Sequence, residues 1–127
     1  MSNRFSTAVN CMDGRVQLPL IEYLKEHTKA DYVDMITEAG PVQYLASATG
    51  TEYDSILQRI RLSIEFHGST DVAICAHADC GGNPVPHENQ KKELAAAATV
   101  LKNNFGDHIQ IITLWIDSDM RVHRLNG

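Results

Sequence analysis

The sequence predicts an α/β fold: a single domain over residues 1–127 in which a mainly parallel four-stranded sheet is flanked by helices. Strand-length apolar segments alternate along the chain with segments of helical period. The length is that of one domain, and 43% hydrophobic with 21% charged residues is an ordinary globular composition. No repeat, low-complexity tract or linker divides the chain.

Strand-length segments recur at intervals that leave room for helices between them. The last of the four is rich in β-branched residues, as strands commonly are. The predicted strands are Phe5–Asn10, Tyr32–Thr37, Asp71–His77 and Ile109–Ile116, and Asp119–Leu125 allows a short fifth strand at the edge. Because helical segments separate the four strands, we expect crossover connections and parallel pairing.

Three helical segments connect these strands. We place Pro19 in the first turn of the first helix, where proline is tolerated, and this helix continues to about residue 27. The second helix has Thr51 near its start and Gly68 as its stop signal. The third is the alanine-rich stretch 88–105.

The net charge limits the classes of partner. The chain has 11 Lys and Arg against 16 Asp and Glu, a formal net charge of −5. It therefore lacks the basic surface typical of nucleic-acid-binding proteins and of proteins that bind anionic membranes. No apolar run approaches the roughly 20 residues that span a bilayer, and the N-terminus has no signal-peptide pattern. The sequence predicts a cytoplasmic protein with a small-molecule substrate.

Cysteine usage points away from a disulfide framework. There are three cysteines, Cys11, Cys75 and Cys80, and an odd, low count in a cytoplasmic chain favours metal binding, thiol chemistry or burial. Cys75 lies within a predicted strand, where burial is the expected role. The other two cysteines follow predicted strands and are the candidates for chemistry.

Three residues with metal-binding side chains stand at the carboxyl ends of two strands. Cys11 follows the first strand, His77 ends the third, and Cys80 comes three residues later. In parallel sheets, ligands bind beyond the carboxyl ends of strands. If these strands are neighbours, about 4.8 Å apart, the three side chains can converge. Two thiolates and an imidazole suit zinc better than magnesium or calcium.

Two charged residues beside Cys11 could complete a catalytic site. Three protein ligands leave a fourth position of the kind found in catalytic zinc sites, where the pKa of bound water falls to about 7. Asp13 could orient a zinc hydroxide, and Arg15 could hold Asp13 ionised through a bidentate pair. Alternatively, Asp13 is itself a fourth ligand that closes the site until Arg15 draws it away. A plain surface ion pair is the remaining interpretation.

The pattern Cys11-x-Asp13-x-Arg15, followed by Ala76-His77-Ala78-Asp79-Cys80-Gly81, resembles that of the β-class carbonic anhydrases over nearly the whole chain. The resemblance implies a sheet order of 2-1-3-4. It implies zinc held by Cys11, His77 and Cys80, with Asp13 and Arg15 as a catalytic pair. The implied reaction is reversible hydration of carbon dioxide to bicarbonate, with zinc hydroxide as nucleophile. Members of the family form dimers or larger assemblies, so a homodimer or higher homo-oligomer is expected.

One segment departs from the family pattern. Where the family usually has Arg-Asn-Ala-Gly-Asn, this sequence reads Thr37-Glu38-Ala39-Gly40-Pro41. Ala39 and Gly40 are retained and, with Gly81, are the expected substrate contacts. Glu38 near the mouth of the site would disfavour a bicarbonate anion by like charge. An altered or absent hydratase activity therefore stays open.

Three other functions also stay open. A zinc hydrolase of carbonyl sulfide or carbon disulfide would use the same mechanism, and only substrate assays would separate it. A catalytically inactive zinc-binding protein would keep Asp13 on the metal at all pH values. A metal-free thiol enzyme would use Cys11 or Cys80 as nucleophile. The Cys-x5-Arg pattern of one phosphatase class is absent, because position 17 is Gln and position 86 is Pro.

Overall fold

The computed structural model describes residues 3–126 as alternating strands and helices. The strands are β1 (Phe5–Cys11), β2 (Tyr32–Glu38), β3 (Asp71–His77), β4 (Gln110–Ile116) and β5 (Val122–Arg124). The helices are α1 (Gly14–Thr28), α2 (Pro41–Ser47), α3 (Thr51–His67) and α4 (His87–Phe105). No helix within these residues combines the length and apolar character needed to cross a membrane.

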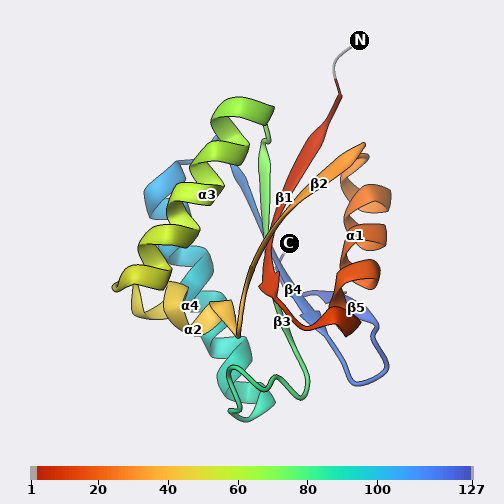
Figure 1. The fold of residues 1–127 in the computed structure, drawn as a ribbon, viewed down its shortest axis with the longest axis vertical. Helices are drawn as coiled ribbons and strands as arrows, with labels where there is room; N and C mark the ends of the chain where they lie inside the picture. The colour runs from red at the N-terminus through yellow and green to blue at the C-terminus, as the bar shows by residue number, and fades with distance from the viewer. Residues whose placement is uncertain (1–2, 127) are drawn as a thin grey trace.

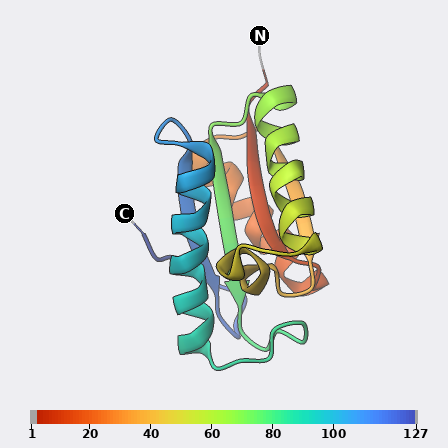
Figure 2. The same ribbon diagram turned by 90° about the vertical axis from the view of Figure 1, so that its left-hand side faces the viewer.

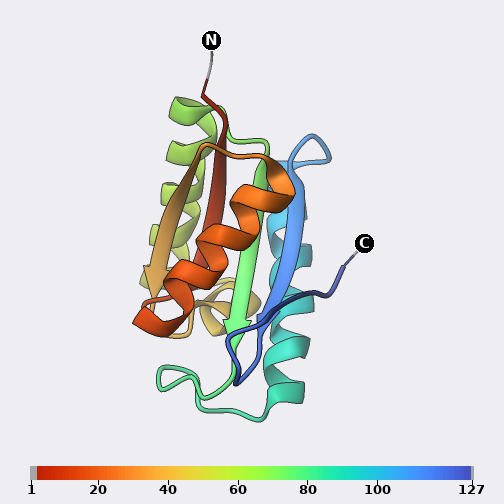
Figure 3. The same ribbon diagram turned by 90° about the vertical axis from the view of Figure 1, so that its right-hand side faces the viewer.

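The sheet has the order β2-β1-β3-β4-β5, with β5 antiparallel and the other pairs parallel. This confirms the expected α/β class and the order of the four main strands. Because β1 and β3 are neighbours, the chain segments that follow them lie at one edge of the sheet. Figure 3 shows the arrows of β2 and β3 ending at that edge, where the loop after β3 begins.

Helices cover both faces of the sheet, as Figure 1 shows. On one face, α1 packs over a cluster that includes Ala8, Ala73 and Leu114. On the other face, α2, α3 and α4 bury a larger cluster around Val9 and Ile74. Figure 2 shows α3 and α4 lengthwise on this face, with the short α2 near the carboxyl edge of the strands. Strands buried on both sides explain the near-continuous apolar runs of β3 and β4.

The first helix starts earlier than its sequence suggests. Asp13 is the N-cap of α1, and its carboxylate accepts a hydrogen bond from the backbone N–H of Arg15 at 2.9 Å. Placing Pro19 in the first turn is therefore wrong, because Pro19 lies inside the helix. The helix tolerates the missing N–H because it buries Val16, Leu20 and Leu24 against the sheet.

A short helix follows β2 directly. The glycine and proline of Ala39-Gly40-Pro41 are residues that commonly interrupt regular structure, but Pro41 opens the short helix α2, with Gly40 as its left-handed N-cap. This helix buries Pro41, Val42 and Leu45, so tertiary packing stabilises a segment too short to be helical alone. The helix α3 begins at Thr51, near which the sequence predicts its start, and Gly50 takes the cap position without a side-chain bond.

Candidate metal centre

Cys11, His77 and Cys80 meet at the carboxyl edge of the sheet. Cys11 is the last residue of β1, His77 is the last of β3, and Cys80 lies in the loop beyond. All three are buried, and one potential ligand atom from each lies within 4.8 Å of the other two. The β1–β3 pairing brings Cys11 beside two residues that are far from it in the sequence.

The spacing of the two sulfurs suits a shared metal. Cys11 Sγ and Cys80 Sγ are 3.8 Å apart. A disulfide would require about 2.0 Å, so these are two free thiols. Two thiolates bound to one tetrahedral zinc at about 2.3 Å each would lie about 3.8 Å apart. Without a cation, burial and the Cys11 sulfur raise the pKa of the Cys80 thiol above its ordinary value.

The imidazole of His77 is oriented as a metal ligand usually is. Its Nδ1 lies 2.7 Å from the carbonyl oxygen of Ala78, which can only accept a hydrogen bond. Nδ1 therefore carries the proton, and Nε2 keeps a free lone pair. Nε2 is buried and has no hydrogen-bond partner among the described residues, 3–126. A buried polar atom without a partner is costly, and a bound cation would satisfy it.

Asp13 and Arg15 form a close pair beside this cluster. Arg15 Nη2 lies 2.7 Å from Asp13 Oδ2, and Arg15 Nε lies 3.1 Å from Asp13 Oδ1. The hydrogen bonds from Arg15 lower the pKa of Asp13 to about 2, and the same pairing raises the pKa of Arg15. Arg15 Nη2 also lies 3.4 Å from the carbonyl oxygen of Asp79, which links the first turn of α1 to the Cys80 loop.

Two glutamines that the sequence analysis overlooked hold the loops of the site. Gln17 Nε2 lies 2.7 Å from the Cys11 carbonyl oxygen and 3.1 Å from that of Asp13. Gln43 Nε2 lies 2.7 Å from the Gly82 carbonyl oxygen and 3.0 Å from that of Gly40. The sequence marks these two residues only as polar positions near the start of a helix. Because such positions are common on helix surfaces, they could not be singled out from the sequence.

The Ala39-Gly40 segment packs directly against the loop after Cys80. A Cβ placed on Gly40 would come within 2.6 Å of the Asn83 Cβ, and one on Gly82 within 2.6 Å of the Ala39 carbonyl carbon. Gly40 also has a φ of +62°, which disfavours other residues. Gly81, in contrast, has open space around it. The geometry thus gives Ala39 and Gly40 a packing role, whereas their contact with substrate stays a prediction.

The remaining cysteine and the other histidines of residues 3–126 do not belong to the metal-binding cluster. Cys75 is buried within β3, and burial raises the pKa of its thiol. His87 lines an open pocket of about 420 Å³ together with Cys80 and Gly81. The remaining histidines form other contacts or are exposed. For example, His67, the last residue of α3, pairs with Asp34 of β2.

The whole chain fits one family. The family model described as "Putative carbonic anhydrase" matches residues 1–126. The chain belongs to this carbonic anhydrase family. A comparison with curated proteins found no match.

Solved structures of carbonic anhydrases share the fold. A carbonic anhydrase from Streptococcus mutans is 18% identical, with a TM-score of 0.68 over 98% of this chain and 84% of that one. A tetrameric β-carbonic anhydrase from Sordaria macrospora is 11% identical, with a TM-score of 0.66 over 100% of this chain and 83% of that one. The β-carbonic anhydrase CcaA is 13% identical, with a TM-score of 0.60 over 100% and 75%. The expected membership of a β-class carbonic anhydrase family is confirmed.

Proposed function

We propose that this carbonic anhydrase family member binds one zinc ion through Cys11 Sγ, His77 Nε2 and Cys80 Sγ and catalyses the reversible hydration of carbon dioxide to bicarbonate and a proton. One observation carries the proposal: a ring nitrogen of His77, whose buried Nε2 has no hydrogen-bond partner among residues 3–126, lies within 4.8 Å of two sulfurs spaced for a single tetrahedral metal. Soft sulfur donors with one imidazole favour zinc over magnesium or calcium.

Zinc with three protein ligands would supply an acidified water, with a pKa near 7, as the nucleophile at neutral pH. The side chains around it have separate roles. The Ala78 carbonyl oxygen holds a proton on His77 Nδ1, so in this tautomer Nε2 is the ring nitrogen available to bind a metal. Burial of all three proposed ligands excludes bulk water from the cluster and strengthens electrostatic interactions there.

Asp13 is the proposed orienting group for the nucleophile. With a pKa of about 2, it is ionised across the neutral range and can only accept hydrogen bonds. It can therefore accept a hydrogen bond from the O–H of the attacking water, which would orient an oxygen lone pair toward carbon dioxide. Arg15 holds the carboxylate through both its Nη2 and its backbone N–H. The same bonds oppose the alternative in which Asp13 swings in as a fourth metal ligand.

Self-association is the proposed quaternary state. The related Sordaria macrospora enzyme is described as tetrameric. In this chain, Phe66 and Leu62 expose 77% and 47% of their surface on α3. Large exposed apolar side chains on one helix are consistent with a contact between copies. Light scattering at micromolar concentration will measure the assembly, and a strictly monomeric protein would contradict this part of the proposal.

The decisive test is stopped-flow measurement of carbon dioxide hydration from pH 6.5 to 9, with zinc content determined in the same sample. We expect activity that rises with pH and scales with zinc. Full zinc occupancy without hydration at any pH would reject the reaction while retaining the metal site. Carbonyl sulfide and carbon disulfide would then be the next substrates to assay. Protein purified without added metal that contains no zinc and cannot take it up would reject the metal site as well.

A further inference from the structure

Glu38 places a carboxylate next to the proposed metal site. It is the last residue of β2 and lies in register with Cys11 of β1. Its carbonyl oxygen accepts a hydrogen bond from the N–H of Met12 at 2.9 Å. Two positions earlier, Ile36 and Val9 share the core face toward α3, so alternation puts Glu38 and Cys11 on that face too. The strands are about 4.8 Å apart, so the Glu38 side chain stands beside the Cys11 ligand.

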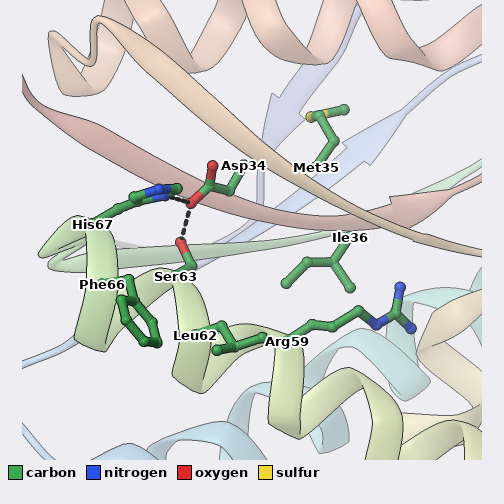
Figure 4. Close-up of a pocket in the computed structure, with 8 residues that line it drawn as sticks. All are labelled: Asp34, Met35, Ile36, Arg59, Leu62, Ser63, Phe66 and His67. Carbon is green, nitrogen blue, oxygen red and sulfur yellow. Dashed lines mark hydrogen bonds and ion pairs between the residues drawn. The ribbon is translucent and has the colours of Figure 1, made fainter.

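Arg59 of α3 reaches across to this carboxylate. Its Nη2 forms an ion pair with Glu38 Oε2, and its Nη1 lies 3.5 Å from the Thr37 carbonyl oxygen. The two side chains are 35% and 28% exposed, so the pair is partly shielded from water. Figure 4 shows Arg59 lying along a groove of about 390 Å³, with its guanidinium at the opposite end from the Asp34–His67 pair.

Arg59 supplies the countercharge of Glu38. Two thiolates neutralise a divalent zinc, and Arg15 neutralises Asp13. Glu38 would then leave one uncompensated negative charge beside the metal, and Arg59 cancels it. A free carboxylate there would repel an anion that approaches the metal. The sequence alone suggests this repulsion, whereas the folded chain supplies its countercharge from a residue 21 positions away.

We propose that Arg59 is a specificity-determining residue, which neutralises Glu38 and so keeps the mouth of the metal site open to anions such as bicarbonate. This inference rests on the proposed function. It explains how a glutamate can replace the asparagine of the family pattern at the edge of a site that must bind and release an anion. Arg59 acts through Glu38 and does not itself contact the substrate, so removing Glu38 must remove the need for Arg59.

A double-mutant cycle on the cobalt(II)-substituted protein tests this inference without an activity assay. Azide and bicarbonate are titrated while the visible cobalt spectrum is recorded at pH 7.5. Arg59→Gln should weaken anion binding roughly three- to tenfold, because it removes one partly screened unit charge near the proposed site. The Glu38→Gln, Arg59→Gln double variant should return to within about twofold of the parent. Arg61→Gln is the matched control, because it removes the same charge from α3 at a residue that stacks on Phe105.

Three results would overturn the inference. An anion affinity in Arg59→Gln equal to that in Arg61→Gln would show that only long-range charge matters. The double variant could stay as weak as Arg59→Gln, which would make the role of Arg59 structural. The parent's cobalt spectrum could also be unchanged by either anion, in which case no anion reaches the metal. A parent protein that binds neither cobalt nor zinc is a different failure, because it rejects the proposed function itself.

Discussion

Gln17 donates a hydrogen bond from its side-chain amide to the carbonyl oxygen of Cys11, with 2.7 Å between the nitrogen and the oxygen. The same nitrogen lies 3.0 Å from Asn10 Oδ1 and 3.1 Å from the Asp13 carbonyl oxygen. Asn10 is fully buried and anchors this arrangement in β1. One side chain of α1 thus fixes the turn that carries both a proposed metal ligand and the proposed orienting carboxylate.

Replacing Gln17 should therefore make the turn that carries Cys11 and Asp13 less ordered. Gln17→Ala is expected to lower zinc affinity about 10- to 100-fold, as loss of outer-shell support typically does. It should also lower the free energy of unfolding of the metal-free protein by about 1–3 kcal/mol, because buried acceptors lose their donor. Chelator competition and urea denaturation measure the two effects. Gln58→Ala, at an exposed site on α3, is the control. Equal zinc affinity in both variants would refute the role of Gln17.

Metal content should depend on Cys11, His77 and Cys80 but not on Cys75, the cysteine outside the cluster. His77→Ala and Cys80→Ser are each expected to lose bound zinc and hydration together, because two remaining ligands cannot hold a tetrahedral site tightly. Cys75→Ala is the matched control, since Cys75 is buried in β3 but lies outside the cluster. It should keep one zinc per chain at a modest cost in stability. Mass spectrometry for metals gives the answer, and full zinc in His77→Ala would undo the ligand assignment.

Local patterns in the sequence were enough to predict the main strands and their order in the chain. Hydrophobic runs mark β1 to β4, and helical segments between them imply parallel pairing. That pairing places Cys11 and His77 at one edge before any contact is known. What local patterns miss is tertiary. The helix α2 exists through packing, and the Glu38–Arg59 pair joins two elements that have no common motif. The assignment of zinc ligands stays a prediction until metal is measured.

Asp13 should affect turnover much more than metal binding. Asp13→Asn keeps a cap for α1 but loses the charge that Arg15 holds, so the group no longer acts as a pure acceptor. We expect zinc content to stay the same and kcat to fall roughly 100-fold or more. Asp107→Asn, at an exposed position after α4, controls for the charge change. Hydration that is equal in the two variants would remove Asp13 from the mechanism.

Alanine substitution of the two neighbouring glycines after Cys80 should affect stability very differently. Gly82→Ala would push a Cβ to 2.6 Å from the Ala39 carbonyl carbon, so a loop that carries Cys80 must shift. We expect a loss of about 1–3 kcal/mol in the free energy of unfolding and weaker zinc binding. In Gly81→Ala the added Cβ has no atom within 4 Å, so the free energy of unfolding should stay within about 0.5 kcal/mol of the parent value. If Gly81→Ala nevertheless raises KM, Gly81 contacts the substrate as the sequence analysis predicts.

Asp71 at the start of β3 gives the protein a distinct pH dependence, far from the metal site. Its carboxylate is buried, and Oδ1 accepts a hydrogen bond from Ser6. Oδ2 lies 3.6 Å from Arg4 Nη2 and has no hydrogen-bond partner in the part of the chain that the structure describes. Burial raises the pKa of Asp71 above its ordinary value of 3.8. The folded state therefore binds this proton at a higher pH than the unfolded state does. It follows that ionised Asp71 destabilises the fold at neutral pH, and this cost is relieved as the pH falls through the raised pKa toward 3.8.

Asp71→Asn should remove that dependence, because an amide does not titrate in this range. We expect the free energy of unfolding of the parent, minus that of Asp71→Asn, to increase as the pH is lowered from 7 to 4. Urea denaturation at several pH values measures this difference, and Asp107→Asn at an exposed site supplies the background. A difference that decreases on acidification would reverse the sign, and would mean that Arg4 and Ser6 stabilise the ionised carboxylate more than burial destabilises it.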